Sequence, residues 1–460
     1  MPRNCIRFHN KPEGDACLPP FWRWRRPLKS ALLFLALTLP LSGCDFGDNT
    51  PNSSMPPPPT TVLATQTTKP TDAPPFQPTQ PIHPSIPAPL PTGASTSANA
   101  RDMNQAWGAN LPIARVPLLV DDQHAFILNA VTPDARFLVG SVVTRNADEH
   151  GGTEPGKAVL LDVQSHQATE MHVFPRKDTQ MGQASADDEW VVWSEAAQEP
   201  GFFADWVIYS YNRKTHSVKQ VAAAPREKNG ELITGGPLVF PKVDHGIVVW
   251  SQIPPASTDN VHILVMSADL VTGKVSTLTD LGQQPTISWP YVAWEGPRPD
   301  TPQTLTRTQE TCIYLLNLET NVTKALKSTH NTSYFALYKG AVVWISEHGD
   351  QVILTDVDES KSQVIAQPGE ASGGPLQYPS ISNRLVTWVS YTRTEAWDRT
   401  EQKLVYVVNP YGLQGTSIAN GNAYAWQSGG SPEQAAESQG DMGATGITLN
   451  VLDSSQLPVH

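Results

Sequence analysis

From about Leu111 onward, the chain alternates apolar runs of four to eight residues with clusters of Gly, Pro, Asn, Asp and Ser. Runs of this length that are rich in β-branched and aromatic residues, and that are bounded by turn-forming residues, predict β-strands. The 3.6-residue apolar period of an amphipathic helix does not stand out anywhere in this region. The pattern therefore predicts an all-β domain over residues 111–460.

The predicted strands fall into groups in which two apolar strands precede an amphipathic one. One group holds EWVVWSE, WVIYSYN and SVKQVAA, and the next holds GIVVWSQ, HILVMSADL and KVSTLTD. A decline in apolar character from the first strand to the last is expected of a small sheet that packs face to face between two neighbours. Each group thus predicts one small sheet with its own outer edge.

The groups are copies of one unit. The segment GGPLVFPKVDHGIVVWSQ (235–252) is matched by GGPLQYPSISNRLVTWVS (373–390), with the Gly pair, Pro and Trp at the same spacing. Six strands contain a Trp at a related position, namely Trp193, Trp250, Trp294, Trp344, Trp388 and Trp426. Units of about 40–50 residues with about four strands are typical of β-propeller blades.

A seventh group, at about 124–174, has TPDARFLVGS in place of the Trp strand. Sharing residues 124–460 among seven blades gives about 48 residues per blade, which fits the usual repeat length. We predict a propeller of seven four-stranded blades. Six blades are the alternative if the first or last group only completes a neighbour at the closure of the ring.

The segments VVWSE, IVVWSQ and AVVWISEHGDQVILTDV resemble the repeats of TolB-like (WD40-like) β-propellers. In that family an apolar strand ends in Trp, a polar turn follows, and an "IYLYDL" strand comes next, for which CIYLLNLET is the counterpart here. TPDARFLV is similar to the "SPDGxxLAF" phrase of the same superfamily. The resemblance covers about 340 residues and implies the fold, because the group has many functions. The family's Pal-binding motif has no counterpart in this chain.

The N-terminal residues 1–43 are predicted to be a lipoprotein signal peptide. Arg23, Arg25, Arg26 and Lys29 precede the short apolar run ALLFLALTLPLSG, as in a secretory signal. Leu41 to Cys44 resemble the bacterial lipobox, in which the Cys thiol is acylated and becomes the new N-terminus. An ordinary signal that ends near a Cys by chance is the alternative. Fatty acyl (palmitate-type) chains on Cys44 would anchor the protein to a membrane.

Residues 44–105 are predicted to be a disordered linker. Pro, Thr, Ser and Ala dominate its composition, and 14 prolines lie between residues 51 and 100. Such a segment lacks the apolar groups needed to offset the entropy of ordering. In extended polyproline-like form about 55 residues span at most roughly 170 Å. We expect this tether to hold the folded domain away from the membrane.

Charge and cysteine content narrow the class of protein further. Loss of residues 1–44 would leave 25 basic and 42 acidic residues, a net charge near −17. Nucleic acid would repel such a chain, so we expect no nucleic-acid partner. Beyond Cys44 only Cys312 remains. It has no disulfide partner and lies in an apolar run, where a small buried side chain is expected.

The repeated Trp side chains are expected to fill the layers between blades. The polar residues that follow them differ from blade to blade, and we expect them to gather on one face around the mouth of the central channel. Trp397 is a further candidate for stacking on a ligand. The candidate ligand- or partner-binding residues are therefore Glu195, Gln252, Glu295, Glu347, His348, Trp397 and Gln427.

The sequence contains no group of His, Cys, Asp and Glu residues at a spacing typical of a complete metal site. SEHGD (346–350) and NADEH (146–150) place a His beside carboxylates, but without a signature spacing. His124, His166, His216, His245 and His262 share no common register in the sequence. We expect neither a metal nor a cofactor.

The first hypothesis for function is a lipid-anchored, extracytoplasmic and monomeric propeller in the bacterial cell envelope that binds a protein or glycan without catalysis. The alternative is a glycan lyase or hydrolase in which Glu195, Glu295, Glu347 or His348 meet at the channel mouth. A structural envelope component is the third reading. GxSxG, HExxH, GxGxxG, a Walker loop and the sialidase Asp-box are all absent from the sequence.

Overall fold

The computed structural model describes residues 101–118, 120, 124–144, 154–197, 205–227, 229–232, 239–254, 263–301, 310–326, 329, 331–332, 334–346, 348–367, 376–389, 394–407, 417–429 and 447–459. All of them belong to one of the two units into which the chain divides. The predicted signal peptide, Cys44 and most of the predicted linker lie outside the described residues.

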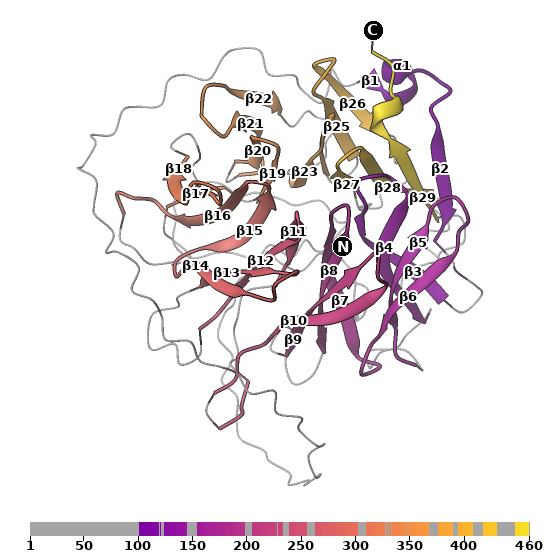
Figure 1. The fold of residues 1–460 in the computed structure, drawn as a ribbon. Helices are drawn as coiled ribbons and strands as arrows, with labels where there is room; N and C mark the ends of the chain where they lie inside the picture. The colour runs from indigo at the N-terminus through magenta and orange to yellow at the C-terminus, as the bar shows by residue number, and fades with distance from the viewer. Residues whose placement is uncertain are drawn as a thin grey trace, which may run out of the picture. The chain divides into compact units, whose positions relative to one another are not determined.

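Seven sheets, each built from strands that are mostly consecutive in the chain, make up this unit (Figure 1). We number them blades 1 to 7. Blade 1 holds β3 (His124–Val131), β4 (Phe137–Thr144), β5 (Lys157–Asp162) and β6 (Ala168–Val173). Blade 2 holds β7 (Thr179–Ala186), β8 (Trp190–Ala197), β9 (Trp206–Asn212) and β10 (Ser217–Ala223). Blade 3 holds β11 (Lys242–Asp244), β12 (Ile247–Gln252), β13 (Leu264–Asp269) and β14 (Val275–Thr279).

The remaining blades repeat this order. Blade 4 holds β15 (Gln283–Ser288), β16 (Tyr291–Pro297), β17 (Thr311–Asn317) and β18 (Val322–Ala325). Blade 5 holds β19 (Tyr334–Tyr338), β20 (Ala341–Ile345), β21 (Val352–Asp356) and β22 (Ser362–Ala366). Blade 6 holds β23 (Gln377–Ile381), β24 (Leu385–Val389), β25 (Thr394–Asp398) and β26 (Lys403–Val407). Blade 7 begins with β27 (Ser417–Asn420), β28 (Ala423–Gly429) and β29 (Ile447–Asp453).

The first strands of the blades contact one another in a closed cycle, from β3 through β7, β11, β15, β19 and β23 to β27 and back to β3. The fourth strand lies at the opposite edge of each sheet. This arrangement defines a seven-bladed β-propeller whose first strands line a central channel. The sequence prediction of seven four-stranded blades is confirmed, and the six-bladed alternative is wrong.

Both ends of the described chain build the last blade. β2 (Ile113–Pro117) pairs antiparallel with β29 and supplies the fourth strand of blade 7. Upstream of it, β1 (Arg101–Asp102) adds a parallel fifth strand to blade 6, next to β26, and α1 (Met103–Trp107) follows. Residues 101–105, which the sequence pattern places in the linker, therefore belong to the propeller. A two-residue strand and a single helical turn are too short to leave a periodic pattern.

Each repeated Trp packs against the preceding blade, as expected from the sequence. Trp250 is 1% exposed and lies in a cluster with Val192 and Ile208 of blade 2. Trp388 is fully buried among Val343 and Val352 of blade 5. The other four repeated Trp side chains lie in corresponding clusters.

Blade 1 has no Trp at the repeated position, and a different side chain fills the layer between it and the preceding blade. Gly140 occupies the position that Trp takes in the other blades, and the ring of Phe126 from the first strand fills the space. A Cβ atom at Gly140 would lie 2.6 Å from the Phe126 ring. Phe126 is 1% exposed and packs against Ala425 and Leu449 of blade 7. The wedge between blades 7 and 1 is thus filled from the first strand and not from the second.

The two faces of the propeller differ in the length of their connections. In an antiparallel blade, the links between strands one and two and between strands three and four lie at one end, which we call the turn face. These turns run from two residues (289–290) to five (357–361). The opposite end, the loop face, carries the other links, which include 145–156, 224–241, 298–310 and 430–446. All the long connections therefore emerge on one face.

Hydrogen bonds join neighbouring blades at the turn face. Asp187 of blade 2 accepts from the Gly246 N–H of blade 3 at 2.9 Å, and Asp244 of blade 3 accepts from the Trp289 N–H of blade 4 at 2.8 Å. In the same way Ser288 accepts from the Lys339 N–H at 2.9 Å. Since the bonded residues end the first strand of each blade, the links fix the spacing of the blades around the channel.

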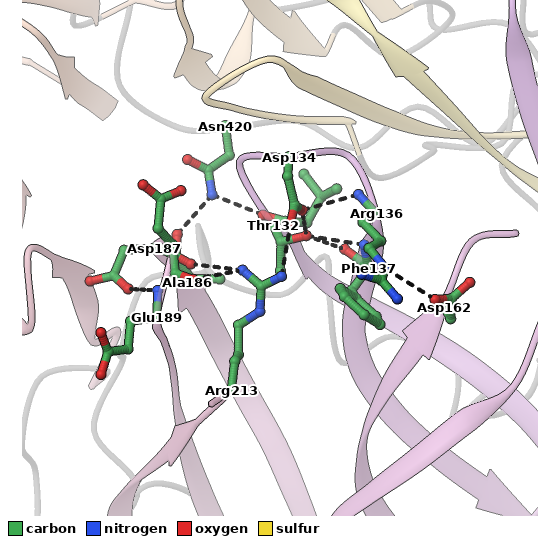
Figure 2. A network of polar contacts seen from close by, with 12 residues as sticks. Thr132, Asp134, Arg136, Phe137, Asp162, Ala186, Asp187, Glu189, Arg213 and Asn420 are labelled. Atoms are coloured by element: carbon green, nitrogen blue, oxygen red, sulfur yellow. Dashed lines mark hydrogen bonds and ion pairs between the residues drawn. The ribbon is translucent and has the colours of Figure 1, made fainter. Parts of the chain in front are cut away.

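Figure 2 shows where blades 7, 1 and 2 meet on this face. The Asn420 side chain of blade 7 donates to the Val131 carbonyl of blade 1 and to the Ala186 carbonyl of blade 2, at 2.8 Å each. Arg213 of blade 2 donates to the Asp134 carboxylate of blade 1 at 2.9 Å. One side chain thus spans three consecutive blades, which closes the ring at its first blade.

A buried ion pair joins α1 and the C-terminal segment 457–458 to blade 6. Arg384, which is 8% exposed, binds the Asp398 carboxylate at 2.8 Å, and Asp398 is fully buried. Asp398 also accepts from the indole N–H of Trp107 in α1 at 2.9 Å. Arg384 donates in addition to the carbonyls of Leu457 and Pro458 at 2.7 Å each. We call these residues the terminal clasp.

Candidate functional site

In blades 2 and 3 the residue two positions after the repeated Trp accepts a hydrogen bond from the indole of that Trp. Successive side chains of a strand point to opposite faces, so residues two apart share one face. The Trp193 indole N–H donates to Glu195 at 2.7 Å, and the Trp250 indole N–H donates to Gln252 at 3.0 Å. Buried indole N–H groups need an acceptor. Glu195 and Gln252 therefore lie with Trp193 and Trp250 between blades.

Glu195 is 3% exposed and lies between blades 1 and 2. Its Oε1 atom also pairs with His172 Nδ1 from the outer strand of blade 1, at 2.8 Å. Burial raises the pKa of Glu195, although its bonds to Trp193 and His172 act in the opposite direction. His172 in turn stacks on Tyr209, with ring centroids 4.4 Å apart. This arrangement joins two blades and holds the carboxylate away from the channel mouth.

Glu295 follows Trp294 by one residue and therefore points to the opposite face of β16, between blades 4 and 5, where it is 7% exposed. It accepts hydrogen bonds from the Thr311 hydroxyl at 2.6 Å and from the Gln283 amide at 2.8 Å. Burial raises its pKa, and these two neutral donors offset that effect only in part. Glu195 and Glu295 are thus buried in different layers, and the structure does not bring them together as an acid–base pair.

The other predicted site residues are separated as well. His348 is exposed in the segment 346–351 on the loop face, and Gln427 is half-buried near the loop-face end of β28. Trp397 is 7% exposed and belongs to the cluster between blades 5 and 6, with Ile381 and Leu404, so its ring is not presented to a ligand. Glu347 and Cys44 lie outside the described residues.

Two histidines share a register that the sequence pattern did not reveal. His166 and His216 each stand four residues after the Asp or Asn that ends a third strand, and both have a positive φ, 57° and 55°. Asp162 and Asn212 cap these turns by accepting from the backbone N–H groups that follow. The two histidines are therefore equivalent turn residues on the turn face.

Within the described ranges, no cluster of three or more His, Cys, Asp or Glu side chains is arranged to hold a metal ion. Cys312 is buried, as expected, and burial raises the pKa of its thiol to about 12. A thiol with so high a pKa stays protonated and is a poor nucleophile. The helices among residues 101–459 that the structure describes include none that is long and apolar enough to cross a membrane.

The first strands present the residues that sequence reasoning missed. In β7, Ala184 and Ala186 are buried against blade 1, whereas Gln183 and Ser185 keep partial exposure and make hydrogen bonds to the first strand of blade 3. Lys242 of β11 keeps partial exposure in the same way, between the buried Pro241 and Val243. The sequence contains a signal that could have drawn attention to Lys242. It is a charged residue in the repeat at 235–252, and the copy at 373–390 has Ser380 at the same position.

Lys242 is the charged group that the structure adds to the candidate site. Its ammonium donates to the Gln183 side-chain oxygen of blade 2 at 3.3 Å, across the wall of the channel. Lys242 is half-buried, and desolvation by the surrounding protein lowers its pKa to about 8. Among the described residues no carboxylate forms an ion pair with it.

No family model matches the sequence, and no curated protein matches it. Solved structures, in contrast, match this chain. TolB from Acinetobacter baumannii is 15% identical, with a TM-score of 0.33, over 54% of this chain and 58% of TolB. The β-propeller domain of the Trilobed protease from Pyrococcus furiosus is 8% identical, with a TM-score of 0.47, over 73% of this chain and 95% of that domain.

Oligogalacturonate lyase from Vibrio parahaemolyticus is 9% identical, with a TM-score of 0.43, over 75% of this chain and 97% of the lyase. The shared feature is the β-propeller fold. This chain spans less than two thirds of the TolB structure that it matches. At these identities the likeness concerns the fold alone, and the function has to be argued from the residues of this chain.

Proposed function

We propose that this protein is a non-catalytic binding module, held on the outer side of a bacterial membrane by lipid on Cys44, that takes a protein or glycan partner on the loop face of its propeller. The observation that carries the proposal is the asymmetry between the two faces. Turns of two to five residues, cross-linked between blades, form the turn face, and all the long connections lie on the loop face.

Long connections on a rigid scaffold are the usual place for binding residues, because they vary in sequence without disturbing the core. Here the scaffold is fixed by the repeated Trp side chains and by the bonds between turns. The loop-face segments 145–156, 298–310 and 430–446 differ in length and sequence from blade to blade. Such variety on one face suits the recognition of a single partner.

The placement of the acidic residues supports binding over glycan hydrolysis. A glycosidase needs two carboxyl groups within about 10 Å of each other that face the substrate. Glu195 and Glu295 instead lie in separate layers and accept hydrogen bonds from Trp193 and Thr311. These two carboxyl groups supply hydrogen-bond acceptors to polar groups that become buried when the blades pack.

Membrane attachment through Cys44 predicts a specific phenotype. In cells, Cys44→Ala should move the protein from the membrane fraction to the soluble fraction, or leave it as an unprocessed precursor, because the variant lacks the thiol that is acylated. Cell fractionation followed by intact-mass measurement reads both outcomes. Cys312→Ala, which changes a buried thiol, is the matched control and should fractionate as wild type. A Cys44→Ala protein of mature size in the membrane fraction would refute the anchor.

Site-specific photo-crosslinking tests the binding face. A photoreactive amino acid is placed at exposed loop-face positions, Glu154, Asp300 and His348, and at exposed turn-face positions, Gln164, Val271 and Glu319. We expect irradiation of intact cells to yield one shared adduct from the loop-face set and none from the turn-face set. Adducts only from the turn face would contradict the proposal.

A further inference from the structure

We propose that Lys242 forms an anion site in the central channel, where it binds the carboxylate of a sugar unit that enters from the loop face. The inference deepens the proposed function, on which it rests, by naming a carboxylated glycan as the partner. Its basis is a cation on the channel wall whose only hydrogen-bond partner among the described residues is a neutral amide.

The charge of Lys242 is not balanced by the nearest acidic residues of its own and the preceding blade. Asp187 and Asp244 stand further along the first strands, at the turn face. The Asp187 oxygens accept from the backbone N–H groups of Trp190 and Gly246. Asp244 accepts from the Trp289 N–H and pairs with His245 at 2.9 Å. Neither acid forms an ion pair with Lys242 in the structure.

An isolated buried charge is costly, and a ligand of opposite charge removes that cost. The ammonium of Lys242 donates one hydrogen bond, at 3.3 Å, to Gln183, although it has three protons to donate. A carboxylate has two oxygens that accept such bonds, and charge-assisted bonds of this kind are stronger than neutral ones. The geometry therefore fits an anion better than a neutral ligand.

The scaffold itself does not require a lysine at this position. In the matching repeat the equivalent residue is Ser380, whose hydroxyl accepts from the Ala419 N–H of the next blade at 2.9 Å. In blade 2 the equivalent Ser185 accepts from the Val243 N–H at 3.2 Å. Two blades thus use this position to link neighbours with a serine, whereas blade 3 has a lysine there, whose ammonium donates to Gln183 of blade 2.

The neighbouring first-strand positions supply groups suited to a sugar. Gln183 is half-buried in β7, and Gln284 stands exposed at the bulge of β15. Tyr334 and Tyr378, at the same level of blades 5 and 6, have ring centroids 4.9 Å apart and tilted by 50°. Amides bind hydroxyl groups, and phenol rings offer both apolar faces and hydroxyls. A sugar acid combines the three kinds of group that these residues recognise.

The test uses the full-length protein in detergent, with ligand-observed NMR to measure binding of D-glucuronate, D-glucose and the tripeptide Gly-Gly-Gly. We expect D-glucuronate to bind at pH 7 at least tenfold more tightly than D-glucose or the tripeptide. Lys242→Met, which keeps the length of the side chain, should weaken D-glucuronate at least tenfold. Lys361→Met, an exposed turn-face substitution, should bind as wild type.

Two further readouts separate binding from folding. Lysine carries its charge below its pKa, so affinity for D-glucuronate should fall as the pH rises past about 8. Lys242→Met should melt at the wild-type temperature or above it, because it removes an unbalanced buried charge.

Unchanged binding of D-glucuronate to Lys242→Met, equal binding of D-glucose, or no binding of any probe would overturn the inference. Binding of the tripeptide in preference to D-glucuronate would also overturn it and would indicate a peptide carboxylate. Loop-face crosslinks without D-glucuronate binding would leave the proposed function in place while rejecting the sugar acid.

Discussion

Replacing Arg384 by alanine is expected to lower the free energy of unfolding by about 3–5 kcal/mol, the usual cost of removing one partner from a buried ion pair. Asp398 would lose the guanidinium that accompanies the Trp107 indole as its partner, in a site with no solvent exposure. The carbonyls of Leu457 and Pro458 would each lose a donor as well. Chemical denaturation at pH 7, followed by tryptophan fluorescence, measures the loss.

Arg136→Ala is the matched control for this prediction. Arg136 also pairs with an aspartate that ends a third strand, Asp162, but at 3.4 Å and with 64% of its side chain exposed. Exposed ion pairs contribute about 0–1 kcal/mol. If Arg384→Ala cost no more than Arg136→Ala, the terminal clasp would not hold α1 and the segment 457–458 to blade 6.

Trp388→Ala is expected to lower the free energy of unfolding by about 3–5 kcal/mol, because it empties a large volume between blades 5 and 6. Trp388 is fully buried, and its indole N–H donates to the Glu395 carboxylate at 2.9 Å. Both the lost apolar contacts and the lost donor contribute to the effect. Thermal and chemical denaturation at pH 7 measure it.

Trp388→Phe separates the two contributions. Phenylalanine retains much of the ring volume but cannot donate to Glu395, and leaving a buried acceptor without its donor costs about 1–3 kcal/mol. We therefore expect Trp388→Phe to fall between wild type and Trp388→Ala. A near-neutral Trp388→Ala would mean that the ring faces solvent and that the repeated Trp is available for ligands.

The repeat allowed the blade number and the role of the Trp side chains to be predicted. Trp250 and Trp388 stand at identical points of two long matching segments, and a residue that every blade needs is a packing residue. Closure of the ring could not be predicted, because the pairing of Ile113 with Leu452 joins residues far apart in the chain. A contact of this range leaves no local pattern.

The candidate site was harder to predict because polar residues in a propeller form hydrogen bonds within the scaffold as well as with ligands. Glu195 and Gln252 follow their Trp by two residues, and the two-residue period of a strand turns them toward the indole N–H. Lys242 stands in a three-residue strand, too short to show that period, so its contact with Gln183 of the preceding blade emerged only from the structure.

Crosslinking from the two faces in intact cells identifies the binding surface most directly. We expect a common partner adduct from Glu154, Asp300 and His348 on the loop face, and no adduct above background from Gln164, Val271 and Glu319 on the turn face. Equal adducts from both sets, or adducts from the turn face alone, would contradict the claim that the loop face is the binding surface of this propeller.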